Sequence, residues 1–116
     1  FREEHSPRIF VPKVDFVSAA ATTPEVKRRG GPYALLTNMA LFDFDRSRSG
    51  FVLRSVHPGY SPADVRSQTG FDYAEPADVA TTPLPDADTL ALLRGRIMDE
   101  LAETYPAFAR AMLQAA

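Results

Sequence analysis

The chain has 116 residues, enough for one small domain, and its formal net charge of −2 offers no basic excess for nucleic-acid binding. It contains no cysteine, which excludes a disulfide framework, a thiolate metal site and a cysteine nucleophile, and which fits a reducing cytosol. No apolar run approaches the length of a membrane span and no signal peptide is visible, so we expect a cytoplasmic protein without membrane contact. Since the chain starts with Phe1 rather than methionine, we expect a processed product or a piece of a longer polypeptide.

The first expected strand lies in the segment 9–17, which is rich in β-branched and aromatic residues. Pro12 removes a ladder donor there, so the strand itself is predicted over Val14–Ser18. His5, in the polar stretch before this segment, is expected to be solvated. Residues 19–32 contain two proline motifs and are expected to form a long loop.

The middle of the chain predicts a strand followed by a hairpin. Tyr33–Thr37 is nearly continuous apolar, which is typical of a strand covered on both faces. Leu41–Asp45 and Phe51–Val56 alternate between apolar and polar residues, as half-buried strands do. We expect Asn38–Ala40 to turn or bulge before the hairpin, and Gly50 to supply the unusual dihedral of its loop.

A short helix is predicted after the His57-Pro58-Gly59 turn. Ser61 is a good N-cap, and Asp64 stands at the position from which a carboxylate returns a hydrogen bond to the cap. Val65 is the expected apolar anchor, and Gly70 is expected to end the helix in the left-handed conformation.

The last third predicts an extended connection and then helix. Residues 72–85 are polar and contain three prolines, and Asp86 or Asp88 is expected to cap a longer helix. Pro106 breaks or restarts this helix, with Thr104 as the expected new cap. One apolar stripe recurs at helical spacing, formed by Leu90, Leu93, Ile97 and Leu101.

His57 allows two interpretations. It can line a cleft that binds a thioester or a carboxylate, as a donor or proton carrier. It can also be structural, closing the hairpin with its imidazole bonded to a nearby carbonyl, and this is the interpretation that we favour. Asp43 and Asp45 lie two residues apart, but a solvated strand face explains them better than a carboxylate pair.

No catalytic or metal-binding residue can be assigned from the patterns. The two histidines lie far apart in the sequence and there is no cysteine, so no metal ligand set has a recognised spacing. Gly30-Gly31-Pro32 lacks the spaced glycines and the lysine of a phosphate loop. No serine lies in a glycine-flanked nucleophile elbow.

Taken in order, these motifs resemble the C-terminal part of the beta subunit of family I coenzyme A-transferases. The similarity is greatest to the glutaconate coenzyme A-transferase type and to a branch that degrades steroid rings. The segments that carry the resemblance are Arg8–Val17, Tyr33–Thr37, Leu41–Phe44, Val56–Gly59, Ser61–Phe71 and Leu90–Arg94.

The resemblance implies an α/β fold, a partial open layered sheet of the coenzyme A-transferase type with a hairpin and flanking helices. It places residues 1–116 in the C-terminal part of a beta subunit, with the tail 104–116 longer than usual. It also suggests His57 and Asn38 as substrate-binding residues, because the glutaconate-like branch matches this chain best at these two positions. The resemblance also implies a pocket that binds the anionic coenzyme A. Arg8, Arg54 and Arg66 could each contribute to it, and none of them can be singled out.

The implied activity moves coenzyme A between an acyl-CoA thioester and a carboxylic acid. In the family a beta-subunit glutamate in a Ser-Glu-Asn-Gly type motif attacks the thioester, and covalent catalysis splits the exchange into two easier steps. No such motif occurs in this sequence, so the catalytic glutamate is expected outside it. Coenzyme A is then a thioester substrate, and no cofactor is expected.

The implied partners are a coenzyme A-transferase alpha subunit, the N-terminal half of the beta subunit and an acyl-CoA, in a hetero-oligomer. Two alternatives remain. The first is a hydrolase of the same family that cleaves a ring in a coenzyme A thioester during steroid degradation. The second is a non-catalytic binding or scaffold module, suggested by the missing glutamate and by the apolar tail.

Overall fold

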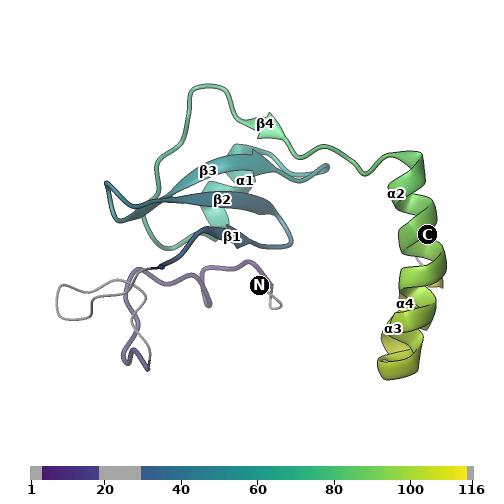
Figure 1. The fold of residues 1–116 in the computed structure, drawn as a ribbon. Helices are drawn as coiled ribbons and strands as arrows, with labels where there is room; N and C mark the ends of the chain where they lie inside the picture. The colour runs from purple at the N-terminus through teal and green to yellow at the C-terminus, as the bar shows by residue number, and fades with distance from the viewer. Residues whose placement is uncertain (1–3, 19–29, 115–116) are drawn as a thin grey trace. The chain divides into compact units, whose positions relative to one another are not determined.

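The computed structural model describes residues 4–18 and 30–114. The chain divides into two compact units, residues 1–82 and residues 83–116. The sequence suggested one small domain, whereas the structure changes at Pro83 from a sheet with one helix to a set of helices (Figure 1).

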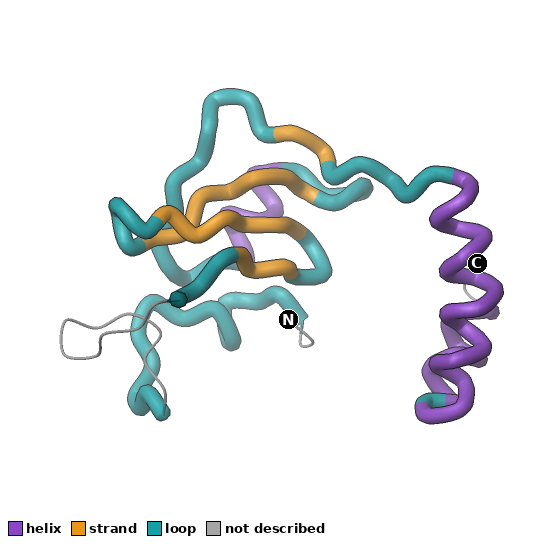
Figure 2. Tube along the Cα trace, viewed as in Figure 1, coloured by secondary structure: helices purple, strands orange, loops and turns teal. Residues whose placement is uncertain are grey.

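The first unit is built on a four-stranded sheet in the order β1-β2-β3-β4 (Figure 2). Its strands are β1 (Ala34–Leu36), β2 (Ala40–Asp45), β3 (Gly50–Val56) and β4 (Ala80–Thr81). The first three strands pair antiparallel in sequence order, while β4 pairs parallel with β3. The predicted hairpin is therefore confirmed, and the α/β class with it.

The hairpin contains a bulge on β3. Leu41 pairs with Ser55 and Phe42 pairs with Leu53, so Arg54 is the extra residue. The bulge keeps Phe42 and Leu53 on the buried face, where neither side chain is exposed. Gly50 was expected to supply the unusual dihedral of the hairpin loop, and this expectation is wrong. The residue with positive φ is Ser49 (φ 50°).

Helix α1 (Pro62–Gln68) follows the predicted pattern. The Ser61 hydroxyl accepts from the Asp64 N–H at 3.2 Å, and the Asp64 carboxylate accepts from the Ser61 N–H at 2.8 Å. This capping box satisfies two peptide donors that a helix start leaves open. Val65 is fully buried and anchors the helix, as expected.

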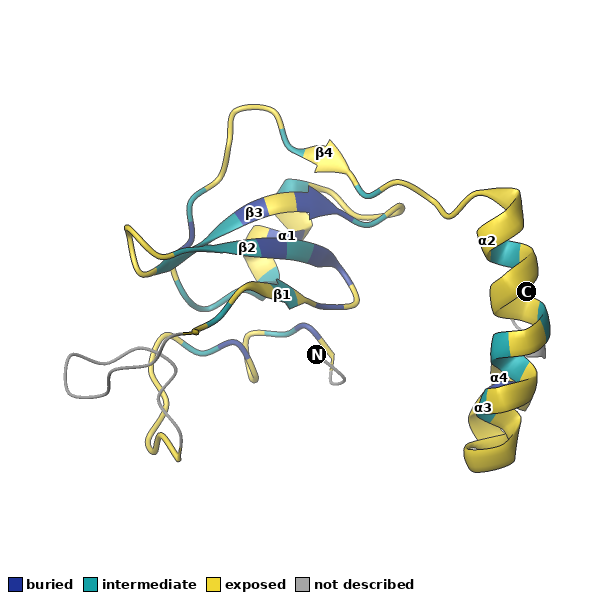
Figure 3. Cartoon of the chain, in the orientation of Figure 1, coloured by how far each residue is buried: buried dark blue, intermediate teal, exposed yellow. Residues whose placement is uncertain are grey.

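The core lies between the sheet and α1 (Figure 3). Its largest fully buried side chains are Phe42, Leu53 and Val65. Tyr73, from the connection after α1, packs edge-on against Phe42 with ring centroids 5.1 Å apart. The Arg66 guanidinium covers the other side of this tyrosine, 3.6 Å from the ring centroid.

Further expectations for the first unit are also wrong. Val14–Ser18 forms no strand, and Phe16 in this segment is 81% exposed. The strand within Tyr33–Thr37 is not covered on both faces, because Tyr33 is 81% and Leu36 is 55% exposed. Gly70 has no positive φ, and Thr69 caps α1 in an extended conformation. The expected loop 19–32 lies mostly outside the described residues.

The second unit contains α2 (Ala87–Leu92), a π-type stretch η1 (Leu93–Ile97), α3 (Met98–Thr104) and α4 (Pro106–Gln114). Its first helix is capped by Asp86, whose carboxylate accepts from the Thr89 N–H at 2.7 Å.

Two breaks divide these helices. Gly95 lies in a non-helical conformation and kinks the segment. Pro106 restarts the helix as expected, but Thr104 is the last residue of α3 and not a cap. Along the predicted stripe Leu90, Ile97 and Leu101 are half-buried, whereas Leu93 is 39% exposed. No helix among the described residues is long and apolar enough to cross a membrane.

Candidate functional site

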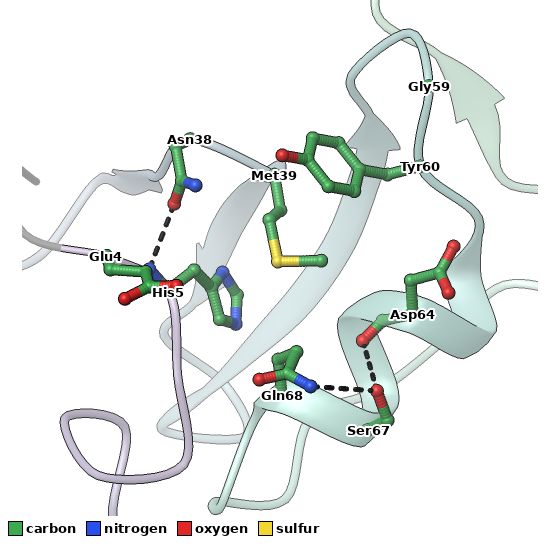
Figure 4. A pocket seen from close by; sticks show the side chains of 9 residues that line it. All are labelled: Glu4, His5, Asn38, Met39, Gly59, Tyr60, Asp64, Ser67 and Gln68. Atoms are coloured by element: carbon green, nitrogen blue, oxygen red, sulfur yellow. Dashed lines mark hydrogen bonds between the residues drawn. The ribbon is translucent and has the colours of Figure 1, made fainter.

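An open pocket of about 490 Å³ lies at one end of the first unit. Four pieces of chain surround it: residues 4–5, the turn between β1 and β2, the turn after β3, and α1 (Figure 4). The lining residues are Glu4, His5, Asn38, Met39, Gly59, Tyr60, Asp64, Ser67 and Gln68.

The turn between β1 and β2 is organised by Thr37, which is buried. Its peptide N–H donates to the Ala40 carbonyl at 2.9 Å, which closes the turn. Its hydroxyl accepts from the peptide N–H groups of Met39 and Ala40, both at 3.1 Å. A short side chain thus satisfies two peptide donors and fixes the residues that carry Asn38 to the pocket.

The turn after β3 begins at His57 and passes through Gly59, whose φ of 93° favours glycine. The Tyr60 N–H donates to the His57 carbonyl at 3.1 Å and closes this turn. The His57 N–H donates to the Met39 carbonyl at 2.8 Å. The two turns are therefore joined by a peptide hydrogen bond beside the pocket.

The His57 ring is half-buried and makes hydrogen bonds at both nitrogens. Nε2 lies 3.0 Å from the Thr37 carbonyl, and Nδ1 lies 2.9 Å from the Thr82 hydroxyl. A carbonyl can only accept, so Nε2 carries the proton and Nδ1 of the neutral ring accepts from Thr82. The Thr82 hydroxyl then accepts in turn from Ser55, at 2.7 Å.

His5 is the residue that sequence reasoning missed. It was expected to be solvated, but only 2% of it is exposed. Its ring bonds the hydroxyls of Thr37 and Thr69, and its peptide N–H donates to the Asn38 side-chain oxygen at 3.0 Å. Because these partners lie more than 30 residues away, no local pattern indicates the contact.

The structure thus brings Asn38 to the pocket and places His57 behind it. Asn38 is exposed and lines the pocket, whereas the His57 ring bonds inward to Thr37 and Thr82 and is not among the lining residues. The two are connected through the turn that Thr37 organises. This arrangement contains the imidazole-to-carbonyl bond expected of a structural His57.

The pocket is lined by acidic and uncharged polar groups. Its carboxylates belong to Glu4 and Asp64, and no lysine or arginine is among its lining residues. The Ser61 hydroxyl, and after it the Ser61 peptide N–H, hold the pKa of Asp64 below its ordinary value. The chemistry fits a hydrogen-bonding, uncharged group better than a phosphate or carboxylate.

The three candidate arginines do not line this pocket. Arg54 lies 3.4 Å from Asp43 and Arg66 lies 2.9 Å from Glu75, while Arg8 is exposed. Within residues 4–18 and 30–114 no group of three or more histidine, cysteine, aspartate or glutamate side chains could hold a metal ion.

The chain is similar to known proteins over most of its length. The cholesterol ring-cleaving hydrolase IpdB subunit of Mycobacterium tuberculosis (strain H37Rv) is 34% identical over 98 residues, which cover 80% of this chain and 39% of that subunit. No protein-family model matches the chain. Since the match covers 39% of the IpdB subunit, the chain spans about two fifths of the length of the curated relatives it matches.

Solved structures agree with this relationship. IpdAB of Rhodococcus jostii RHA1 matches with a TM-score of 0.69 and 31% identity over 79% of this chain and 39% of that one. Glutaconate coenzyme A-transferase from Acidaminococcus fermentans matches with a TM-score of 0.67 and 27% identity over 79% of this chain and 38% of that one. About four fifths of the chain is thus homologous to part of the IpdB subunits, and its fold is of the coenzyme A-transferase type.

Proposed function

We propose that this chain is part of a coenzyme A-transferase-like enzyme that moves coenzyme A between an acyl-CoA thioester and a carboxylic acid. The observation that carries the proposal is the match in fold to glutaconate coenzyme A-transferase, with a TM-score of 0.67 over 79% of this chain. Because the chain spans 38% of that protein, the activity belongs to a larger assembly. Its partners are an alpha-type subunit and the N-terminal half of a beta subunit.

In this proposal the catalytic glutamate lies outside the sequence. Attack of the glutamate carboxylate on the thioester carbonyl forms a mixed anhydride and releases coenzyme A as a thiolate. The thiolate attacks the glutamyl carbonyl of the anhydride, which expels the donor acid as a carboxylate and leaves an enzyme thioester. The acceptor carboxylate reverses these two steps, takes up coenzyme A and frees the glutamate. Coenzyme A is a substrate here and no cofactor is required. The expected cytoplasmic location belongs to the same proposal.

Asn38 is the side chain that we propose to contact substrate. Its oxygen accepts from the His5 N–H, which leaves the amide NH₂ group as the donor that can face a ligand in the pocket. An amide donor suits an uncharged carbonyl oxygen of an acyl-CoA. The acidic lining by Glu4 and Asp64 disfavours the phosphates of the same molecule.

We propose that His57 supports substrate binding indirectly, by holding the turn that carries Asn38. Its Nε2–H holds the Thr37 carbonyl and its peptide N–H holds the Met39 carbonyl. These bonds fix the turn on both sides of Asn38. Replacing His57 is therefore expected to weaken substrate binding by displacing this turn.

A second function is favoured by a specific observation. The relatives at 34% identity are cholesterol ring-cleaving hydrolase subunits, so hydrolytic ring cleavage of a coenzyme A thioester is the alternative chemistry. A non-catalytic binding or scaffold module is the third candidate, since no nucleophile can be assigned within the chain.

Product analysis by mass spectrometry separates these functions. The natively purified assembly is incubated with glutaconyl-CoA and acetate, and in parallel with a ring-containing acyl-CoA and no acceptor acid. Acetyl-CoA formation is expected for a transferase. Addition of water to the ring substrate, without acetyl-CoA formation in the first reaction, would indicate the hydrolase. An assembly that turns over neither substrate contradicts the transferase proposal and leaves the binding module.

A further inference from the structure

The segment of residues 4–10, called here the N-terminal strap, is attached to the rest of the first unit through His5 and through Phe10. The His5 ring lies between Thr37 and Thr69, and the His5 N–H donates to the Asn38 side chain. The Phe10 carbonyl accepts from the Gly70 N–H at 2.6 Å, and the Phe10 ring packs edge-on against Phe71 with centroids 5.8 Å apart. A turn closed by the Phe10 N–H and the Ser6 carbonyl at 2.9 Å brings the His5 and Phe10 rings to 4.4 Å. The strap forms one wall of the pocket, through Glu4 and His5.

The hydrogen bonds around His5 require one protonation state. The Thr69 hydroxyl donates to the Val65 carbonyl at 2.7 Å, so it must accept from His5 Nε2–H, at 2.8 Å. Nδ1 of the neutral ring is then an acceptor. The Thr37 hydroxyl accepts from two peptide N–H groups, and its one hydrogen is shared between Nδ1, 2.9 Å away, and the Ala40 carbonyl, 3.2 Å away. The neutral Nε2–H tautomer therefore satisfies every group in the cluster.

A proton on Nδ1 breaks this arrangement. Its new N–H would face the Thr37 hydroxyl, whose two lone pairs already accept from the turn. A second donor thus meets a saturated acceptor in a buried position, which is costly.

Among the residues that the structure describes, no titratable side chain is hydrogen-bonded to the His5 ring. On the strap itself the neighbour is Glu4, from α1 it is Asp64, and from the turn after β3 it is Tyr60. The carboxylate of Asp64 is bonded to Ser61, and the His5 ring is hydrogen-bonded to the hydroxyls of Thr37 and Thr69. His57 lies on the far side of Thr37 and already donates to its carbonyl. Consistent with this geometry, burial lowers the pKa of His5 from its ordinary value of 6.5.

We propose that the N-terminal strap is a proton-operated latch, in which protonation of His5 releases the strap from Thr37 and Thr69 and removes one wall of the pocket. The released imidazolium is solvated by water, and Phe10 separates from Gly70 as the strap leaves. The pocket is then complete at neutral pH and open on the strap side in acid.

The Gly70 amide proton reports the state of the latch, because its acceptor is the strap carbonyl of Phe10. Hydrogen exchange of the full chain is followed by NMR from about pH 7.5 to about pH 4.5, with rates corrected for the intrinsic pH dependence of exchange. The Gly70 protection factor is expected to fall by up to about tenfold for each pH unit between the ordinary pKa and the lowered pKa of His5, and then to level off. The Thr82 amide, bonded to the Val56 carbonyl at 2.7 Å, is the control that stays protected.

Two variants isolate the histidine. His5→Gln keeps a donor for Thr69 and cannot titrate in this range, so its Gly70 protection is expected to be independent of pH. If His5→Gln releases the strap at all pH values, the wild-type His5 ring titration decides, because its midpoint must lie at the pH where Gly70 protection levels off. Glu4→Gln removes the neighbouring carboxylate of the strap and should keep the pH response. A Gly70 protection factor that stays constant while His5 titrates would overturn the latch.

Discussion

The Gly70 N–H donates a 2.6 Å hydrogen bond to the Phe10 carbonyl, in a contact so close that a Cβ atom on residue 70 would collide with that carbonyl oxygen. The sequence pattern predicts a left-handed helix cap at this glycine. Its φ is not positive, and close approach of the strap is the physical reason for glycine at this position. The contact joins two segments that are 60 positions apart in the sequence.

Gly70→Ala is expected to push the strap away from α1. Relieving the collision requires movement of backbone atoms of Phe10 rather than of a flexible side chain. The expected cost is about 1 to 3 kcal/mol in the free energy of unfolding, as for other overpacked contacts. Urea unfolding measures it. Gly30→Ala is the matched control, because a Cβ there meets nothing within 4 Å, and equal stability losses in the two variants would contradict the account.

Val65→Ala tests the anchor of α1. Val65 is fully buried between the helix and the sheet, so its truncation removes apolar burial and leaves a cavity. We expect a loss of about 2 to 3 kcal/mol in the free energy of unfolding. Val14→Ala, at a position 51% exposed, should change the same quantity by less than about 0.5 kcal/mol. A small effect at both positions would mean that α1 is not packed as described.

The capping box of α1 predicts a pH dependence. The pKa of Asp64 is lowered by the Ser61 hydroxyl and then by the Ser61 N–H, so the folded state favours the carboxylate. The stabilisation is therefore fully present above the ordinary aspartate pKa of 3.8 and is lost as the pH falls through the lowered value. Asp64→Asn should lower Tm near neutral pH, and its difference from the wild type should shrink in acid. A difference in Tm that is constant down to about pH 2 would contradict this origin.

Thr37→Val removes the hydroxyl that organises the turn beside the pocket and keeps the shape of the side chain. The peptide N–H groups of Met39 and Ala40 then lose their acceptor, and His5 loses a partner. We expect a loss of about 2 to 3 kcal/mol in the free energy of unfolding, because the groups left unsatisfied are buried. Thr81→Val, on the exposed strand β4, is the control with little effect. Thermal unfolding followed by circular dichroism gives both values.

Local patterns predicted the elements that local interactions form. The hairpin follows from alternation in two adjacent segments, and α1 follows from a capping box contained within Ser61–Asp64. Both depend on residues close in sequence, so a single sequence without an alignment is sufficient to predict them.

The remaining elements depend on distant contacts. Val14–Ser18 has the composition of a strand, yet a strand also needs a neighbour to pair with, which composition cannot reveal. The burial of His5 requires Thr37 and Thr69, which are 32 and 64 positions away. The resemblance led to Asn38 at the pocket, while the position of His5 in a neighbouring wall of the pocket became apparent only from the structure.

Denaturing mass spectrometry of natively purified material shows whether this chain works as part of a larger coenzyme A-transferase-like enzyme. We expect companion polypeptides, one of which carries a glutamate flanked by serine, asparagine and glycine. A well-folded 116-residue chain that purifies alone would contradict this expectation and favour a stand-alone binding module.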